Sequence, residues 1–198
     1  MNGKAAARRF IHHRIGYLLA IPLLIGPGCV NDASMEDQGP PDGGGSGRIL
    51  YCYQPVSGPD LDKSIRVIGV DGSGDAAVAD LAVSVNAPDF SPTGSHFALY
   101  GYPSDTTWSI YTVRNDGSDL QRLTTTEGVW DHVPDFSPDG SRIVFSRIYP
   151  NEGMRSEVWV MNTDGTEQHH IGIAGDGAVW SPNGTRLAYA DDREGHHD

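Results

Sequence analysis

Three short acidic segments carry the residues whose types and spacing come closest to a metal site. They are Asp71-Gly72-Ser73-Gly74-Asp75, Asn115-Asp116-Gly117-Ser118-Asp119 and Asn162-Thr163-Asp164-Gly165-Thr166-Glu167. Carboxylate and carbonyl oxygens in one loop are the ligands that calcium prefers. None of the three has the full calcium-loop pattern with its terminal glutamate, and Asp-Gly is also what a tight hairpin turn requires. We therefore assign no metal ligand, favour turns, and keep a calcium-stabilised structural protein as an alternative.

The other chemically active side chains are isolated from one another. Cys52 lies in an apolar segment, Ile49 to Tyr53, where a thiol acts as a small buried hydrophobe. His169 and His170 are adjacent, so on a strand they point to opposite faces and do not share a metal ion. The sequence has no G-x-S-x-G, H-E-x-x-H, G-x-x-x-x-G-K-[ST] or paired C-x-x-C motif. It therefore predicts no catalytic residue, no cofactor and no enzymatic activity.

A segment that is repeated along the sequence forms the framework for any functional site of this chain. In Pro134 to Ser146, PDFSPDGSRIVFS, the order Ser137-Pro138-Asp139-Gly140 is that of a type I turn between two short strands. The second strand is apolar at its centre on both faces, which predicts a strand covered on both sides. The segment recurs at 88–94 and, degraded, at 179–184.

The spacing of the copies indicates the fold. The residues three after each glycine are Phe97, Ile143 and Leu187, which lie 46 and 44 positions apart, and Ile49 lies another 48 upstream. Segments such as Ser109-Ile110-Tyr111-Thr112, each followed by an Asp-Gly pair, recur along the sequence at a similar spacing. A period in the mid-forties with about four strands per unit is typical of a β-propeller blade.

These motifs resemble those of a known family. The pattern F-S-P-D-G-x-x-I-x-F, followed by a strand such as Val158-Trp159-Val160, a turn containing Asp-Gly, and a Leu-Thr pair as at Leu123-Thr124, is similar to the repeat of TolB-like β-propellers. The resemblance covers residues 48–192 and implies an all-β fold. Similar repeats occur in the gating propellers of prolyl-oligopeptidase-like peptidases, so the resemblance does not fix a function. Trp130-Asp131 resembles the Trp-Asp signature of other propellers, but it occurs only once. We place it in the connection before Pro134 and interpret the resemblance as a coincidence.

The number of blades predicts a partial, open ring. Residues 48–87 account for three strands, 88–133 and 134–178 for four each, and 179–192 for two, with a polar tail at 193–198. About three four-stranded blades cannot close a propeller, since closed rings have four to eight. Either the chain is a fragment of a longer protein, which we favour, or a homo-oligomer completes the ring.

The N-terminal segment predicts export. Residues 1–28 combine a basic head with an apolar run from Ile15 to Ile25, which is too short to cross a bilayer as a helix. Cys29 then stands where signals that resemble Leu-Ala-Gly-Cys carry the lipidated cysteine of bacterial lipoproteins, although Gly26 and Pro27 depart from that pattern. The alternative is ordinary cleavage that leaves a free cysteine. Residues 29–47 thus hold the lipid-attachment cysteine and a Gly, Pro and acidic linker that we expect to be disordered.

Charge narrows the range of partners. Removal of residues 1–28 takes away four of the 14 basic residues and none of the 26 acidic ones, so the formal charge goes from −12 to −16. Such a domain is repelled by phosphate backbones and anionic lipid heads, so we expect no nucleic acid and membrane contact only through the lipid anchor. We predict a non-catalytic module that recognises envelope proteins or peptides, with the outer membrane preferred. The alternative is the recognition propeller of a peptidase without its hydrolase domain.

Overall fold

The chain folds into short antiparallel strands arranged in four sheets. The computed structural model describes residues 33–36, 47–53, 64–79, 81, 84–102 and 107–191. The first sheet has the order β1 (Ala33–Glu36), β2 (Arg48–Tyr53), β3 (Ser64–Gly69), β4 (Ala76–Ala79), and the second β5 (Ser84–Phe90), β6 (His96–Tyr102), β7 (Ser109–Arg114), β8 (Gln121–Arg122). The third has β9 (Trp130–Phe136), β10 (Arg142–Tyr149), β11 (Arg155–Asn162), β12 (His169–Ala174), and the fourth β13 (Asp176–Trp180) and β14 (Leu187–Ala190).

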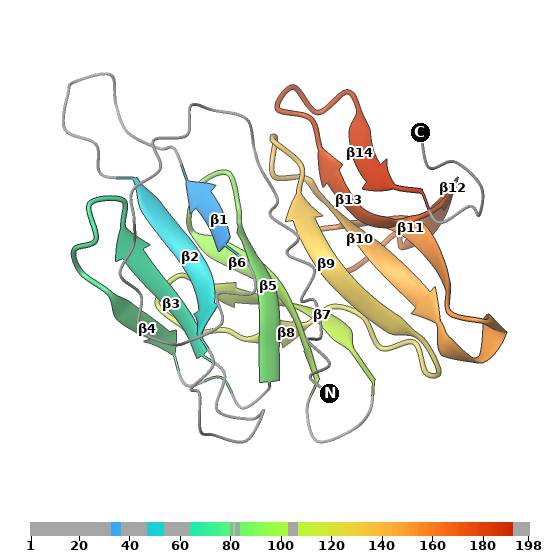
Figure 1. Ribbon diagram of the computed structural model, residues 1–198, viewed down its shortest axis with the longest axis horizontal. Helices are drawn as coiled ribbons and strands as arrows, with labels where there is room; N and C mark the ends of the chain where they lie inside the picture. The colour runs from blue at the N-terminus through green and yellow to red at the C-terminus, as the bar shows by residue number, and fades with distance from the viewer. Residues whose placement is uncertain are drawn as a thin grey trace, which may run out of the picture.

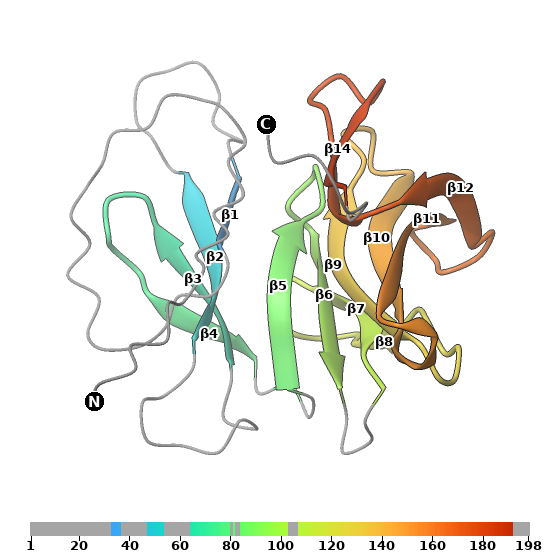
Figure 2. The same ribbon diagram turned by 45° about the vertical axis from the view of Figure 1, so that its right-hand side comes forward.

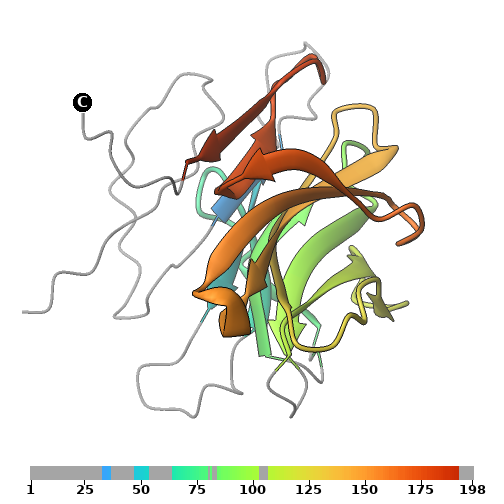
Figure 3. The same ribbon diagram turned by 90° about the vertical axis from the view of Figure 1, so that its right-hand side faces the viewer.

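The sheets follow one another around a common axis in chain order. Figure 1 shows them in succession from β1–β4 on the left to β13–β14 on the right, and Figure 2 shows the second sheet between the first and the third. The first strands of successive sheets lie side by side, because β1 contacts β5, β5 contacts β9 and β9 contacts β13. In the side view of Figure 3 the third sheet lies in front of the second. Within the described ranges, these sheets form an open part of a β-propeller rather than a closed ring.

The predicted type I turn is confirmed in each repeat. The Gly140 N–H donates to the Ser137 carbonyl at 2.8 Å, and the Ser137 hydroxyl accepts from the Arg142 N–H at 3.0 Å. Gly140 has a φ of 69°, a left-handed conformation that glycine adopts without a steric penalty. The same pair of contacts closes the turns that begin at Ser91 and Ser181. These turns connect the first and second strands of the second, third and fourth sheets.

The first strands of the second, third and fourth sheets begin upstream of the repeat boundaries predicted at residues 88, 134 and 179. Pro88 and Pro134 lie inside β5 and β9, which are edge strands of their sheets, and both prolines fall in a β-bulge. The residue before each proline has a positive φ, 44° at Ala87 and 50° at Val133. The interpretation of Trp130-Asp131 as part of a connection is wrong, because both residues belong to β9. A bulge tolerates proline, since its extra residue makes no ladder bond.

The core consists of three apolar clusters, each between two successive sheets. Leu50 packs with Phe97 between the first and second sheets, and Ile110 packs with Phe145 between the second and third. Val144 packs with Ala178 between the third and fourth. Neighbouring residues of β10 thus enter different clusters, which confirms a strand covered on both faces. Burial between sheets, rather than within one, therefore stabilises the assembly.

Two aspartates tie successive sheets together. Asp89 on β5 accepts a hydrogen bond from the Phe136 N–H at 2.8 Å, and Asp135 on β9 accepts one from the Trp180 N–H at 2.7 Å. Both carboxylates occupy the same repeat position, in the Pro-Asp-Phe segment before the turn. A buried carboxylate that accepts a backbone N–H fixes the position of one sheet relative to the next.

The first sheet differs from the predicted one. Residues 33–36 form β1 and pair with β2 from Ala33 opposite Tyr51 to Glu36 opposite Arg48. The prediction of a disordered linker over residues 29–47 is wrong for these four residues, since β2 has an edge whose N–H and C=O groups need partners. Residues 1–32, including Cys29, and the tail at 192–198 lie outside the described residues. None of the described segments is a helix long and apolar enough to cross a membrane.

Candidate functional site

Four aromatic and imidazole side chains gather where the first strands of the sheets begin. The Ser-Pro-x-Gly turns join the end of β5 to the start of β6 and the end of β9 to the start of β10. The end of β6 and the starts of β7 and β9 therefore lie at the opposite end of the sheets. Tyr100 on β6, Trp108 just before β7, and Trp130 and His132 on β9 meet there. We call these four residues the aromatic cluster.

The two tryptophans form the centre of the cluster. The rings of Trp108 and Trp130 stack with centroids 5.0 Å apart and an angle of 27° between their planes. Tyr100 lies against Trp108 at 5.6 Å. The Asp131 N–H donates to the Trp108 carbonyl at 3.0 Å, so the backbone of β9 holds the second-sheet tryptophan in place. Tyr100, Trp108 and Trp130 are all partly exposed, so the cluster combines a fixed position with an accessible surface.

His132 joins the cluster to the fourth sheet. Its ring lies edge-on to Tyr100 at 5.8 Å and to Trp108 at 6.1 Å. Its Nε2 lies 3.2 Å from Asp176 Oδ1 at the start of β13, a distance typical of an ion pair, but the angle does not suit a hydrogen bond. A β-bulge begins directly after His132. Residues from three successive sheets thus meet at one place.

Asp176 supplies the accessible charge next to the cluster. The His132 side chain is only 9% exposed, whereas that of Asp176 is 42% exposed. Burial raises the pKa of Asp176, but contact with His132, Ser146 and the Gly177 N–H outweighs it and lowers the pKa to about 2. The carboxylate is therefore ionised at neutral pH.

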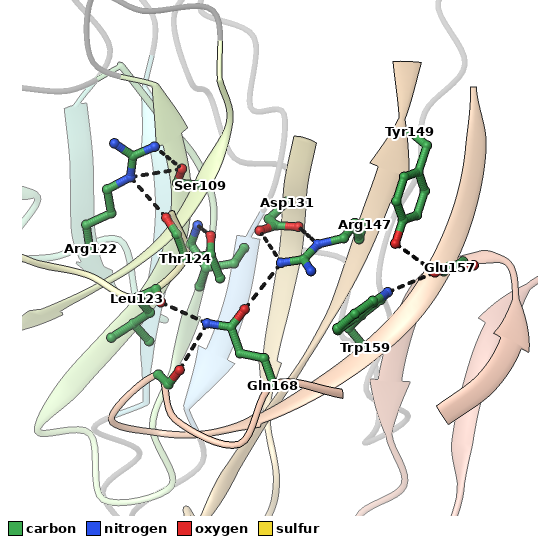
Figure 4. Close-up of polar contacts among 12 residues, drawn as sticks. Ser109, Arg122, Leu123, Thr124, Asp131, Arg147, Tyr149, Glu157, Trp159 and Gln168 are labelled. Carbon is green, nitrogen blue, oxygen red and sulfur yellow. Dashed lines mark hydrogen bonds and ion pairs between the residues drawn. The ribbon is translucent and has the colours of Figure 1, made fainter. Parts of the chain in front are cut away.

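A buried ion pair between Asp131 and Arg147 stabilises the start of β9. The Arg147 guanidinium on β10 donates to both oxygens of Asp131 at 2.6 and 2.9 Å, and the two side chains are only 5% and 2% exposed. Figure 4 shows this pair, with Gln168 bridging Arg147 to the Leu123 carbonyl of the second sheet. Arg147 also lies over the Trp159 ring at 4.2 Å. These contacts fix the strand that carries Trp130 and His132.

The arrangement favours noncovalent recognition. Stacked tryptophans beside a carboxylate offer apolar area, aromatic faces and one negative charge. His132 contacts no serine, threonine or cysteine nucleophile among the contacts recorded for the described residues. Within those same residues, no three His, Cys, Asp or Glu side chains lie close enough together to hold a metal ion.

The sequence matches the family model of the TolB beta propeller domain over residues 60–198, which is more than half of the chain. The chain belongs to the TolB beta propeller family.

Solved structures agree with this TolB-type fold. The protein described as TolB from Agrobacterium tumefaciens is 23% identical, with a TM-score of 0.60 over 72% of this chain and 54% of that one. TolB from Acinetobacter baumannii is 21% identical, with a TM-score of 0.65 over 77% of this chain and 38% of that one. An oligogalacturonate lyase in complex with manganese is 11% identical, with a TM-score of 0.55 over 74% and 44% of the two chains. At these identities the likeness concerns the fold, and this TolB-type chain spans about half or less of their lengths.

The acidic segments of this TolB-type propeller use their carboxylates within their own turns. Asp71 accepts from the N–H and hydroxyl of Ser73 at 2.9 and 2.7 Å. Asp116 and Asp164 make the same contacts with Ser118 and Thr166. These hydrogen bonds lower the pKa of each carboxyl. The geometry is that of an Asx turn and favours the hairpin interpretation over a calcium loop.

The other candidates from the sequence have local roles. Cys52 is a buried residue of the first core cluster and its thiol donates to the Val85 carbonyl at 3.0 Å, as expected for a small core residue. His169 and His170 are exposed on β12, and their rings contact different backbone carbonyls, those of Glu167 and Ile173. Neither residue contributes to the aromatic cluster.

Sequence reasoning missed the aromatic cluster, although two signals pointed to it. Trp130 and His132 are two residues apart on a strand, the spacing of side chains that share a face. Ser84, Trp130 and Asp176 open β5, β9 and β13 at equal intervals of 46 residues, so the repeat itself places Trp130 and Asp176 at equivalent positions of two neighbouring strands. No local pattern marks Trp108, because its proximity to β9 depends on how two sheets pack.

Proposed function

We propose that this chain is an exported, lipid-anchored recognition module of the bacterial cell envelope, which binds a protein or peptide through the aromatic cluster and performs no catalysis. The observation that carries the proposal is the meeting of Trp108, Trp130, His132 and Asp176, from three successive sheets, at one partly exposed place. Tryptophan and tyrosine supply much of the binding energy at protein interfaces, because they bury a large area with few rotatable bonds.

The rigidity of the cluster supports binding rather than only packing. Trp108 is held by a backbone hydrogen bond from β9, and β9 is held by the buried Asp131–Arg147 pair. A site that is already fixed loses little conformational entropy when a partner binds. If the two tryptophans only stabilised the core, full burial of their rings would add to the stability of the fold. Both rings are instead partly exposed.

Peptide selection tests the recognition function. A random peptide library displayed on phage is selected against residues 30–198 of the wild type, which include β1, and, in parallel, against Trp108→Ala/Trp130→Ala in the same residues. We expect families of peptides enriched on the wild type alone. Leu120→Ala serves as the control, because Leu120 is an exposed hydrophobic residue just before β8, at the end of the second sheet that lies opposite the cluster. Selection of the same peptides by all three proteins, or of none by the wild type, would refute recognition at the cluster.

The anchor is tested separately through Cys29. We expect the full chain expressed in a bacterium to partition into the detergent phase of Triton X-114, because its acyl chains prefer an apolar medium. The Cys29→Ser variant should move to the aqueous phase, and Cys52→Ser should not, since Cys52 is buried in the core. Equal partitioning of wild type and Cys29→Ser would refute lipid attachment.

A further inference from the structure

Arginine side chains cover aromatic rings repeatedly in this protein. Arg147 lies over Trp159 at 4.2 Å and Arg155 over Tyr149 at 4.2 Å. Further such contacts join Arg48 to Phe90, Arg66 to Tyr53 and Arg147 to Phe145. A guanidinium over an aromatic face is attracted by the negative charge of the π cloud. The partly exposed rings of Trp159 and Tyr149 in the third sheet thus already have a cation over them.

The Trp108–Trp130 pair differs in this respect. In the part of the chain that the structure describes, no arginine or lysine lies over either ring. The nearest arginine along β10 and β9, Arg147, is committed to Asp131 and to Trp159. Indole is the best cation acceptor among aromatic side chains, and here two indoles are stacked and partly exposed. The pair therefore presents the strongest such surface without a cation of its own.

The electrostatic surroundings favour a cation at this place. The Asp176 carboxylate lies next to His132 at the edge of the cluster and is 42% exposed. The chain without residues 1–28 has a formal charge of −16. An acidic protein attracts a basic partner over long distances, and the local carboxylate then fixes its charged group. An acidic or phosphorylated ligand would meet repulsion.

We propose that the Trp108–Trp130 pair, with Asp176 at the His132 edge of the cluster, binds the guanidinium of an arginine side chain from the partner protein or peptide. Arginine is the better fit than lysine, because its planar group stacks on an indole and still donates to a carboxylate. The proposal rests on the proposed function, since it names the chemistry that the recognised peptide brings to this cluster.

A pair of peptides that differ only in charge tests the proposal. The probe is acetyl-Gly-Ser-Arg-Ser-Gly-amide, and its control carries citrulline, a neutral group of nearly the same shape, in place of arginine. The chain has four tryptophans, so four indole N–H signals report binding in a nitrogen–proton correlation spectrum, each assigned by a Trp→Phe variant. Titration up to about 20 mM covers the weak affinity of a single side chain.

We expect the arginine peptide to shift the indole signals of Trp108 and Trp130 and to leave those of Trp159 and Trp180 in place. The citrulline peptide should bind roughly 10-fold more weakly, because it lacks the charge. Asp176→Asn should weaken the arginine peptide several-fold. Glu167→Gln, which removes the same charge from the exposed β11–β12 turn, should leave its affinity unchanged.

Other results overturn the proposal. Equal shifts with both peptides, shifts confined to Trp159 or Trp180, or no shift of either cluster signal would each exclude an arginine site. The two proposals fail separately. Library peptides that depend on Trp108 and Trp130 but contain no basic residue would leave the recognition function in place and refute the arginine site. A specific response to the arginine probe with no selectable peptide would leave the cation site and refute peptide recognition.

Discussion

Replacement of Arg147 by methionine should strongly destabilise the fold. The change removes one partner of an ion pair whose side chains are 5% and 2% exposed and leaves the Asp131 carboxylate buried without its two donated hydrogen bonds. Loss of one partner from such a pair costs about 3–5 kcal/mol of unfolding free energy. Methionine has an unbranched apolar side chain like the stem of arginine, so this substitution preserves most of the packing against Trp159.

Urea unfolding of four proteins measures this effect. The proteins are the wild type, Arg147→Met, Asp131→Leu and the double variant. Each single variant should lose several kcal/mol, and the double variant should lose clearly less than their sum, with a coupling of at least about 2 kcal/mol, because no buried group is left unpaired. Arg142→Met on the same strand is the matched control, since Arg142 is exposed. Its cost should stay within about 0.5 kcal/mol.

The reasoning would be refuted by a cost of less than about 1 kcal/mol for Arg147→Met, or by additive single and double variants. Either result would place the pair in contact with water and would remove the support that we assign to β9.

Three further predictions concern the contacts between sheets, the acidic pH range and the turns. Asp135→Ala removes the acceptor of the Trp180 N–H at 2.7 Å and should lower the unfolding free energy in urea by about 1.5–3 kcal/mol; an unchanged value would show that this hydrogen bond does not tie the sheets. The pKa of Asp176 is lowered from 3.8 to about 2 in the folded state, so its contribution to stability is present above pH 3.8 and is lost as pH falls toward 2. Asp176→Asn should therefore flatten the dependence of stability on pH in this window, by a small amount because the side chain is 42% exposed, and identical curves would contradict this. A calcium chelator should leave the melting temperature unchanged, because Asp71, Asp116 and Asp164 bond within their own turns, and a fall would revive the calcium-stabilised alternative.

The fold could be predicted from the sequence because its signals are local and repeated. Ser137-Pro138-Asp139-Gly140 specifies its own turn through one backbone and one hydroxyl hydrogen bond, and three copies of it set the period of the sheets. The apolar centre of β10 predicted cover on both faces, which Phe145 and Val144 confirm from opposite sides. In each case the information lies within a few residues.

The details that depend on packing could not be predicted. The repeat predicted units that begin at residues 88 and 134, but β5 and β9 begin at Ser84 and Trp130, and a bulge admits Pro134 inside β9, since the bulged residue makes no ladder bond. β1 forms because β2 needs a partner, which the composition of the linker does not reveal. The aromatic cluster depends on contacts between residues of different sheets, such as the Asp131 N–H and the Trp108 carbonyl. In the sequence, only the two-residue spacing of Trp130 and His132 and the repeat spacing indicate it.

The most direct test of recognition at the cluster is the affinity of one selected peptide for Trp130→Ala, measured by calorimetry. The proposal predicts at least about 30-fold weaker binding than to the wild type, the effect of removing a central aromatic residue from an interface. Leu120→Ala should bind as the wild type does, and the melting temperatures will show whether all three proteins are folded. Equal affinity for the wild type and a folded Trp130→Ala would place the binding site elsewhere and contradict the proposed function.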